Sequence, residues 1–196
     1  MDDIRAGNLG GIGRLQDLVA GAGDRRPAPV ESWNPPYCGD IGLKILRDGT
    51  WLYQGSPIGR PALVRLFAGV LRKDPDGKTY LVTPAEKVDV GVEDAPFLAV
   101  EMEVQGSGSE QRLVFRTNVD DVVACGAEHG LRFAEQQPGG GLKPYVHVRG
   151  RLEALLTRAL LHDLVALAVE DVREGKRAVG IWSGGVFFSL PDVDVD

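Results

Sequence analysis

The sequence predicts an α+β protein made of two similar strand-rich halves, each with one core helix. A turn at Asp48-Gly49 leads into an aromatic strand that begins at Trp51 and then into an amphipathic helix. The spacing Arg60-x-x-Leu63-x-x-Leu66 in that helix recurs as Arg158-x-x-Leu161-x-x-Leu164, again behind a strand that ends in glycine. Any two amphipathic helices can share this spacing, so by itself it leaves open whether the halves are duplicates.

The first 30 residues form a segment of their own. Leu9, Ile12, Leu15 and Leu18 recur at helical spacing, and the prolines from Pro27 onward end the pattern. We therefore expect residues 1–30 to form a short N-terminal helix and a linker that precede the first domain.

The first domain, residues 31–106, is predicted to be rich in strands. Apolar segments that alternate, or that glycine and proline bound, predict strands at residues 41–47, 51–54, 78–83, 88–92 and 97–104. The helix between the second and third of these strands has one apolar stripe that ends in Val70 and Leu71. We expect Arg65, Arg72 and Lys73 to face water.

The second domain is expected to cover residues 107–196, because the flexible composition of 106–109 marks a soft boundary. Strands are predicted at residues 111–117, 131–134 and 145–149, and Asn118 is expected to cap a brief helical turn. The second core helix is predicted to run from Leu160 to Ala168. A final strand or hairpin, residues 180–190, is divided by Ser183-Gly184-Gly185.

Composition and charge exclude several classes of function. The formal net charge is -6 and no basic run interrupts it, so no nucleic acid polymer is expected as a partner. No apolar segment approaches the roughly 20 residues that cross a bilayer, so no membrane is expected either. The N-terminus lacks the pattern of a signal peptide, which favours a cytoplasmic protein with Cys38 and Cys125 as free thiols.

No motif in the sequence spells out a reaction, and we assign no catalytic residue, metal or cofactor. Cys125, Glu128 and His129 supply half of a zinc site at most, because a tetrahedral site needs further sulfur or nitrogen ligands. The glycines lack the spacing of a P-loop or a dinucleotide fingerprint. For Cys38 and Asp40, a packed thiol and a turn-stabilising carboxylate are simpler interpretations than a nucleophile and an acid.

Polar residues do recur at strand ends and elbows, with aromatic residues close to them in the sequence. Arginine pairs with planar anionic groups and stacks on rings, so this mixture could line a ligand site between the halves. Ion pairs and aromatic side chains that fill an interface are the alternative. The candidate ligand-binding residues are Asp40, Trp51, Tyr53, Arg60, Glu86, Arg116, Asn118, Tyr145, Arg149 and Trp182.

Five stretches together resemble the uncharacterised bacterial DUF1285 family, over roughly Pro29 to Leu190. They read PPYCGDIGLKILRDGTWLYQGSPIGR, YLVTPAEKVDVGVEDAPFLAVE, LVFRTNVDDVV, PYVHVRGRLEALL and GIWSGGVFFSL. The resemblance implies two similar α+β halves, the second superficially like a pleckstrin-homology fold, and a ligand site between the domains. It implies no established activity and makes duplication of the halves the favoured interpretation.

The favoured hypothesis is therefore a non-enzymatic cytoplasmic binding or sensing protein with a role in signalling. It would hold a small anionic ligand, for which a nucleotide is one candidate, at the interface of its domains. Two alternatives remain. One is an enzyme of unknown reaction that uses Asp40, Glu86 or Cys38, and the other is an adaptor that binds protein through a strand edge or the N-terminal helix.

Overall fold

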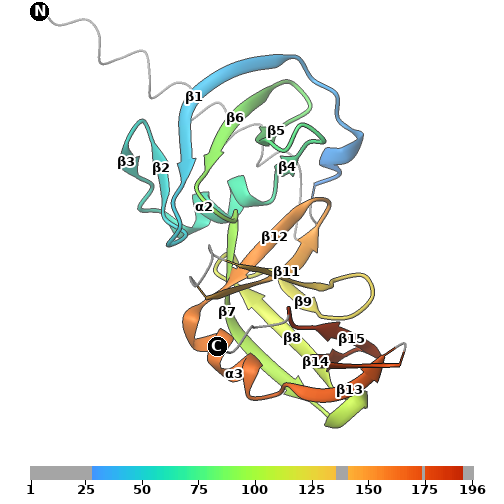
Figure 1. The fold of residues 1–196 in the computed structure, drawn as a ribbon. Coiled ribbons are helices and arrows are strands. Elements are labelled where there is room, and N and C mark those ends of the chain that lie inside the picture. The colour runs from blue at the N-terminus through green and yellow to red at the C-terminus, as the bar shows by residue number, and fades with distance from the viewer. Residues whose placement is uncertain (1–27, 136–140, 174, 192–196) are drawn as a thin grey trace, which may run out of the picture. The chain divides into compact units, whose positions relative to one another are not determined.

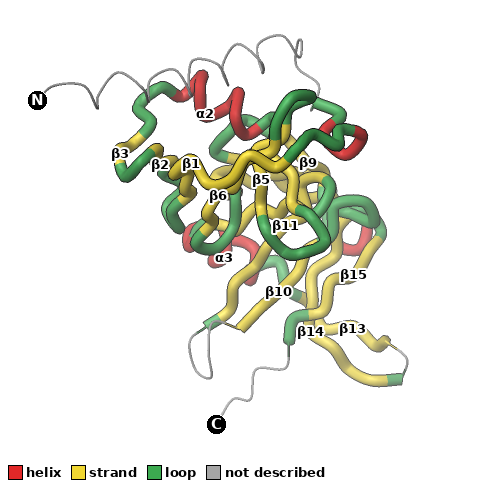
Figure 2. The backbone as a smooth tube through the Cα atoms, turned by 90° about the horizontal axis from the view of Figure 1, so that it is seen from above, coloured by secondary structure: helices red, strands yellow, loops and turns green. Residues whose placement is uncertain are grey.

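The structure is a computed structural model that describes residues 28–135, 141–173 and 175–191. The chain forms two compact units that divide between Glu93 and Asp94. This division lies earlier than the boundary expected at residue 106, because the strand that precedes that boundary pairs with strands of the second unit. The helix expected within residues 1–30 lies outside the described residues. Figure 2 shows that strands predominate and that the helices are short.

The first unit is built on a six-stranded sheet, which we call sheet A, in the order β3-β2-β1-β6-β5-β4 (Figure 1). Its strands are β1 (Tyr37–Ile45), β2 (Trp51–Tyr53), β3 (Ser56–Pro57), β4 (Leu71–Lys73), β5 (Thr79–Val82) and β6 (Lys87–Val92). β1 and β6 are parallel, and every other pair is antiparallel. The predicted hairpin is confirmed: Ile45 pairs with Trp51 across the Asp48-Gly49 turn.

Helix α2 (Pro61–Ala68) adds Leu63, Phe67 and Ala68 to the core of this unit. Phe67 is fully buried, and its ring lies 6.3 Å from that of Trp51. The predicted helix was too long at its C-terminus: it ends at Ala68, and Leu71 begins β4. Both residues are apolar and buried, so a helical stripe and a short core strand could not be told apart from periodicity alone.

Arg72 corrects a second expectation, because its side chain does not face water. The residue is only 9% exposed, and its guanidinium donates hydrogen bonds to the carbonyl oxygens of Val30 and Trp33 at 2.8 and 2.7 Å. Its Nε also donates to Asp74 at 2.6 Å. Arg72 thereby holds the short 3-10 turn η1 (Val30–Ser32) against β4.

The second unit contains a six-stranded sheet B, in the order β10-β11-β12-β7-β8-β9, and a three-stranded sheet C, in the order β13-β14-β15. The strands of sheet B are β7 (Phe97–Gln105), β8 (Arg112–Thr117), β9 (Val122–Ala124), β10 (Leu131–Glu135), β11 (Leu142–Arg149) and β12 (Leu152–Leu156). The 3-10 turn η2 (Gly108–Glu110) lies between β7 and β8 in the chain. Helix α3 (Arg158–Val165) leads to β13 (Val169–Arg173), β14 (Lys176–Ser183) and β15 (Val186–Ser189).

The second unit confirms the C-terminal hairpin and corrects two expectations. β14 and β15 pair on either side of Gly184-Gly185, as predicted. Helix α3 ends at Val165, before Ala168. Asn118 does not cap a helical turn: its side-chain oxygen accepts a hydrogen bond from the amide of Leu98 in β7, at 3.0 Å.

Sheets A and B share one topology. In each, six consecutive strands of the chain take the order third, second, first, sixth, fifth, fourth, with the first and sixth strands parallel. The two helices occupy different places, since α2 lies between the third and fourth strands of its sheet and α3 follows the sixth. The two halves are therefore similar, but the repeated Arg-x-x-Leu-x-x-Leu spacing does not mark equivalent helices.

Candidate functional site

The candidate residues divide between the two units, five in each. In the first unit, Trp51 is 1% exposed and packs in the core, so its ring is not open to a ligand. Tyr53 is half-buried, and Glu86 is half-buried in the turn between β5 and β6. Arg60 is exposed at the N-cap position of α2, where its side chain makes no capping hydrogen bond.

The second-unit candidates are engaged with neighbouring residues. Arg116 makes hydrogen bonds and ion pairs with Glu101 and Asp120. Arg149 makes an ion pair with Asp121, with its guanidinium nitrogen 2.5 Å from Oδ2. The hydroxyl of Tyr145 donates to Asp94 at 2.7 Å. The ring of Trp182 packs edge-on against that of Phe187, with centroids 5.3 Å apart. The side chain of Asn118 accepts the hydrogen bond from the Leu98 amide in β7. Carboxylates of this unit thus neutralise both arginines.

The cysteine and histidine residues do not assemble a metal or nucleophilic site. Burial raises the pKa of the Cys125 thiol to about 11, so the reactive thiolate is scarce at neutral pH. His129 and His147 stack with centroids 5.5 Å apart, and hydrogen bonds join their Nδ1 atoms to main-chain oxygens. Among the described residues, no group of three or more histidine, cysteine or acidic side chains could hold a metal ion.

The candidates of the enzyme hypothesis lie on and near β1. The exposed Cys38 thiol contacts the carbonyl oxygen of Pro36 at 3.6 Å. Asp40 accepts a hydrogen bond from the amide of Gly42 at 2.7 Å, which is the turn-stabilising role expected from the sequence. Of Cys38, Asp40 and Glu86, only Asp40 lines a described cavity, so the structure does not gather the three around one space.

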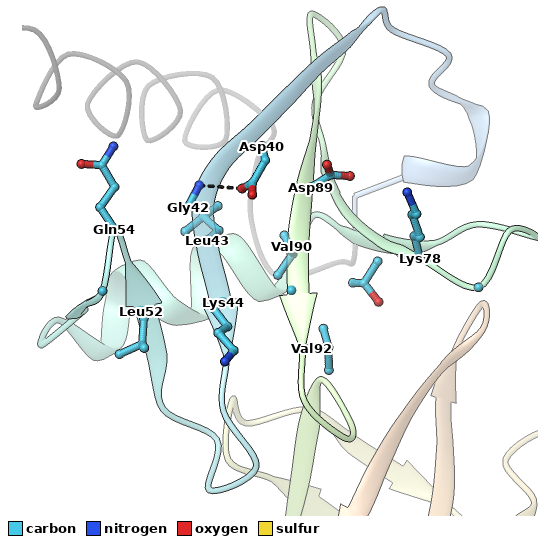
Figure 3. A pocket seen from close by; sticks show the side chains of 14 residues that line it. Asp40, Gly42, Leu43, Lys44, Leu52, Gln54, Lys78, Asp89, Val90 and Val92 are labelled. Atoms are coloured by element: carbon cyan, nitrogen blue, oxygen red, sulfur yellow. Dashed lines mark hydrogen bonds between the residues drawn. The ribbon is translucent and has the colours of Figure 1, made fainter.

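The cavity that Asp40 lines is a hollow of about 610 Å³ in the first unit, which we call the sheet A hollow (Figure 3). Side chains alternate along a strand, so Lys44 and its partner Leu52 lie on the opposite face from Trp51, which contacts α2. The hollow opens on this outer face. Its lining residues are Asp40, Gly42, Leu43, Lys44, Leu52, Gln54, Gly55, Gly77, Lys78, Thr79, Asp89, Val90, Gly91 and Val92.

Irregularity in β1 shapes the hollow. The pairing of β1 with β6 shifts register on both sides of Asp40, which brings Asp40 opposite Asp89. Gly42 has φ +81°, and a Cβ at this position would lie 3.1 Å from Cγ of Gln54, so a larger residue would strain the backbone and crowd β2. Gly91 lines the hollow with its backbone, and the side chain of Lys44 lies next to it, since Cγ of Lys44 is 3.5 Å from the position of a Cβ at Gly91.

The hollow carries charges of both signs. The ammonium of Lys44 pairs with Glu93 at 2.7 Å. Asp40, Asp89 and Lys78 take part in no ion pair with any other described residue. Asp89 accepts a hydrogen bond from the hydroxyl of Tyr37 at 2.5 Å. Figure 3 shows Lys78 on one side of the two carboxylates and Gln54 on the other.

Sequence reasoning found Asp40 but missed the other residues of the hollow. The available signals were weak: an isolated glycine at position 91 within a strand pattern, and the glycines on either side of Asp40. Register, which brings Asp40 to Asp89, cannot be read from one strand at a time. A second cavity of about 590 Å³ lies in the second unit, between residues 122–129 and Gly184-Gly185; sequence reasoning missed it too.

Two family models match consecutive parts of the chain. The N-terminal domain of the DUF1285 family, described as a domain of unknown function, matches residues 28–95. The C-terminal domain, described as a protein of unknown function, matches residues 96–190. The junction of the two matches falls close to the division between the structural units.

Two solved structures of DUF1285 family proteins are similar to this chain. A DUF1285 family protein from Silicibacter pomeroyi DSS-3 is 46% identical, with a TM-score of 0.82 over 92% of this chain and 96% of its own. Another from Shewanella baltica OS155 is 27% identical, with a TM-score of 0.50 over 64% of this chain and 91% of its own. No curated protein matches the chain. Both domain matches and the Silicibacter structure lead to one conclusion: this chain belongs to the DUF1285 family.

Proposed function

We propose that this protein is a non-enzymatic binding protein and that a small polar molecule occupies the sheet A hollow. The hollow's volume, about 610 Å³, lies within the range of roughly 300–1,000 Å³ typical of small-molecule sites. The observation that carries the proposal is that Asp40, Asp89 and Lys78 face this space without ion pairs among the described residues.

Sheet B provides an internal comparison, because it has the same topology. Some of its strand-borne charges are neutralised within the sheet: Arg116 of β8 pairs with Glu101 of β7, and Arg132 of β10 pairs with Glu153 of β12. Glu103, Arg112 and Glu135 are exposed on strands of the same sheet and take part in no ion pair with another described residue. Exposed pairs of this kind are an ordinary way to satisfy a solvated sheet face. Uncompensated charges therefore occur in both sheets, and the support for a ligand is that Asp40, Asp89 and Lys78 line one hollow.

The proposal moves the ligand away from the arginines that the sequence suggested. Arg116 and Arg149 already bind carboxylates, so an anion would have to compete with Glu101 and Asp121. A small ligand, a sensing role and a cytoplasmic location stay part of the proposal. The pleckstrin-homology likeness of the second half stays a prediction. No helix in the described part of the chain has the length and apolar character to cross a bilayer.

A hollow-filling variant tests the proposal. Gly91 has no positive φ, and a Cβ there would make only ordinary contacts, at 3.5 Å or more, so the backbone accepts a side chain at this lining position. We expect the ring of Gly91→Phe to occupy the hollow. We expect a screen of small amines, acids and amino acids to raise the melting temperature of the wild type. At 100 times its Kd a ligand adds about 2.7 kcal/mol to the free energy of unfolding.

The same ligand should not stabilise Gly91→Phe, whereas it should stabilise the control Gly59→Ala as it does the wild type. A Cβ at Gly59 meets nothing within 4 Å, and this residue does not line the hollow. A ligand that stabilises Gly91→Phe and the wild type equally would place its site elsewhere and contradict the proposal.

A protein adaptor is the second candidate, and one observation favours it. β13 is an edge strand of sheet C, and it exposes Val169 and Val172, at 44% and 64%; Val179 of the neighbouring β14 is exposed at 46%. Unpaired strand edges can accept an extended peptide as an additional strand. Val172→Lys should then abolish capture of a partner without changing ligand binding in the hollow; unchanged capture would argue against this edge.

A further inference from the structure

We infer that the ligand of the sheet A hollow carries an ammonium group, bound between Asp40 and Asp89, and an anionic group that meets Lys78. This inference rests on the proposed function and names the chemical class of the ligand, a short aliphatic amino acid with separated charges. The ligand expected from the sequence was an anion held by arginines, whereas this inference assigns the ligand a cationic group held by carboxylates.

Asp40 and Asp89 both supply a carboxylate to the hollow. Asp40 and Asp89 are register partners on adjacent parallel strands, and both line the hollow (Figure 3). Each uses one oxygen in the protein: Oδ1 of Asp40 accepts from the Gly42 amide, and Oδ2 of Asp89 accepts from the Tyr37 hydroxyl. The other oxygen of each has no hydrogen-bond donor among the described residues. Two neighbouring carboxylates without a counter-charge favour binding of a cation between them.

Tyr37 positions one of these carboxylates. Its ring is 57% exposed, and its hydroxyl is held 2.5 Å from Asp89. The hydrogen bond to Asp89 raises the pKa of the Tyr37 hydroxyl, so the tyrosine remains a donor well above neutral pH. Tyr37 also packs edge-on against Tyr80, with ring centroids 6.3 Å apart, which fixes its direction.

The remainder of the lining suits a short aliphatic spacer and an anionic end. Leu52 supplies apolar surface on β2, and the aliphatic stem of Lys44 lies between Leu52 and Gly91, with its Cγ 3.5 Å from the position of a Cβ at Gly91. Lys44 is held by Glu93, so its charge is already compensated. Lys78 is exposed and has no ion pair within the described part of the chain, which makes it the cation available to a ligand carboxylate.

Three probes of equal chain length test the inference on the full-length protein: aminohexanoate, hexylamine and hexanoate. Binding is followed by titration calorimetry and by amide NMR shifts of the hollow residues. We expect aminohexanoate to bind most tightly, hexylamine more weakly, and hexanoate not at all. Asp40→Asn with Asp89→Asn should weaken both amines at least about tenfold, the effect of losing hydrogen bonds to a charged group.

Lys78→Met separates the two ends of the ligand. It should weaken aminohexanoate severalfold and leave hexylamine unchanged, while Tyr37→Phe should weaken both amines. Asp163→Asn is the matched control, because this exposed aspartate belongs to α3 of the second unit and does not line the hollow, so it should change nothing.

The outcomes distinguish the inference from the proposed function. Hexanoate binding at the hollow as tightly as hexylamine, or amine binding that survives the double asparagine variant, would overturn the ammonium assignment. The hollow would remain a binding site, and the proposed function would stand. If none of the three probes shifts the amides of the hollow, the inference fails; the proposed function is then judged on the wider ligand screen with Gly91→Phe.

Discussion

At the scale of single residues, the most informative side chain is Arg72. In the sequence, Arg72 follows the apolar residues of the predicted helix and precedes Lys73, a pattern that predicts a side chain exposed to water. Instead it forms a nearly buried ion pair with Asp74, and Lys87 also bonds Asp74 at 3.1 Å. Burial alone would raise the pKa of the Asp74 carboxyl, but the hydrogen bonds from Arg72 and Lys87 outweigh it and lower the pKa. Asp74 is therefore charged at neutral pH.

Arg72→Met should destabilise the protein by about 1–3 kcal/mol, because it removes the hydrogen bonds to the carbonyl oxygens of Val30 and Trp33 and leaves Asp74 with Lys87 as its only charged partner among the described residues. Lys73→Met is the matched control: it removes the neighbouring positive charge, which takes part in no described ion pair, and should change the free energy of unfolding by about 0.5 kcal/mol or less. Urea unfolding measures both. Equal losses from the two variants would contradict the role given to Arg72.

Tyr145 predicts a loss of stability at high pH. Burial, and then the hydrogen bond to Asp94, raise its pKa from 10.0 to about 12. Because the folded-state pKa is the higher one, the stabilisation is complete below about pH 10 and is lost as pH rises toward 12. We expect the difference in unfolding free energy between the wild type and Tyr145→Phe to shrink over this window. A constant difference would show that the phenol does not ionise there. The pKa values of Tyr80 and Cys125 are also raised, to about 12 and about 11, but both groups are present in the wild type and the variant, so their contributions cancel in the difference.

At the scale of elements, the alternation of apolar and polar residues predicted most strands, but it did not show how closely neighbouring strands pack. Gly180 of β14 shows how close sheet C is packed. A Cβ at this position would lie 2.5 Å from the carbonyl oxygen of Phe188 and 2.6 Å from the ring of Phe187. The sequence shows only a glycine at the start of an aromatic strand, and the reason for it lies on the neighbouring strand.

Gly180→Ala should therefore destabilise the protein by about 1–3 kcal/mol, the usual cost of overpacking, since a backbone atom has to move. Gly59→Ala, whose Cβ meets nothing within 4 Å, should be neutral or stabilise by roughly 0.4–1 kcal/mol through the unfolded chain. Thermal unfolding of the two variants checks this. A neutral Gly180→Ala would mean that β15 yields easily.

At the scale of the whole molecule, the chain consists of two units, each with its own six-stranded sheet and its own core. Leu81 and Phe67 are fully buried in the first unit, and Leu113 and Phe115 in the second. Within the described part of the chain, the strands of sheet A all belong to the first unit, and sheet B lies within the second, so each sheet makes its own ladder of backbone hydrogen bonds.

Leu81→Ala should lower the stability of the first unit by about 2–5 kcal/mol, because it leaves a cavity in a fully buried position. Hydrogen exchange should quicken in β1 to β6 and stay unchanged in β7 to β12. Faster exchange throughout both sheets would show instead that the units unfold together.

The sequence by itself determined the strand-rich character of both halves, the hairpin at Asp48-Gly49, the C-terminal hairpin and the family. These depend on local periodicity, turn residues and long motifs. The tertiary structure decided where the units divide, where each helix ends, and which charges are compensated. It paired Arg116 and Arg149 with carboxylates and brought Asp40 to Asp89 across two parallel strands. Strand register and the distances between charges depend on residues far apart in the chain, and a single sequence does not contain them in readable form.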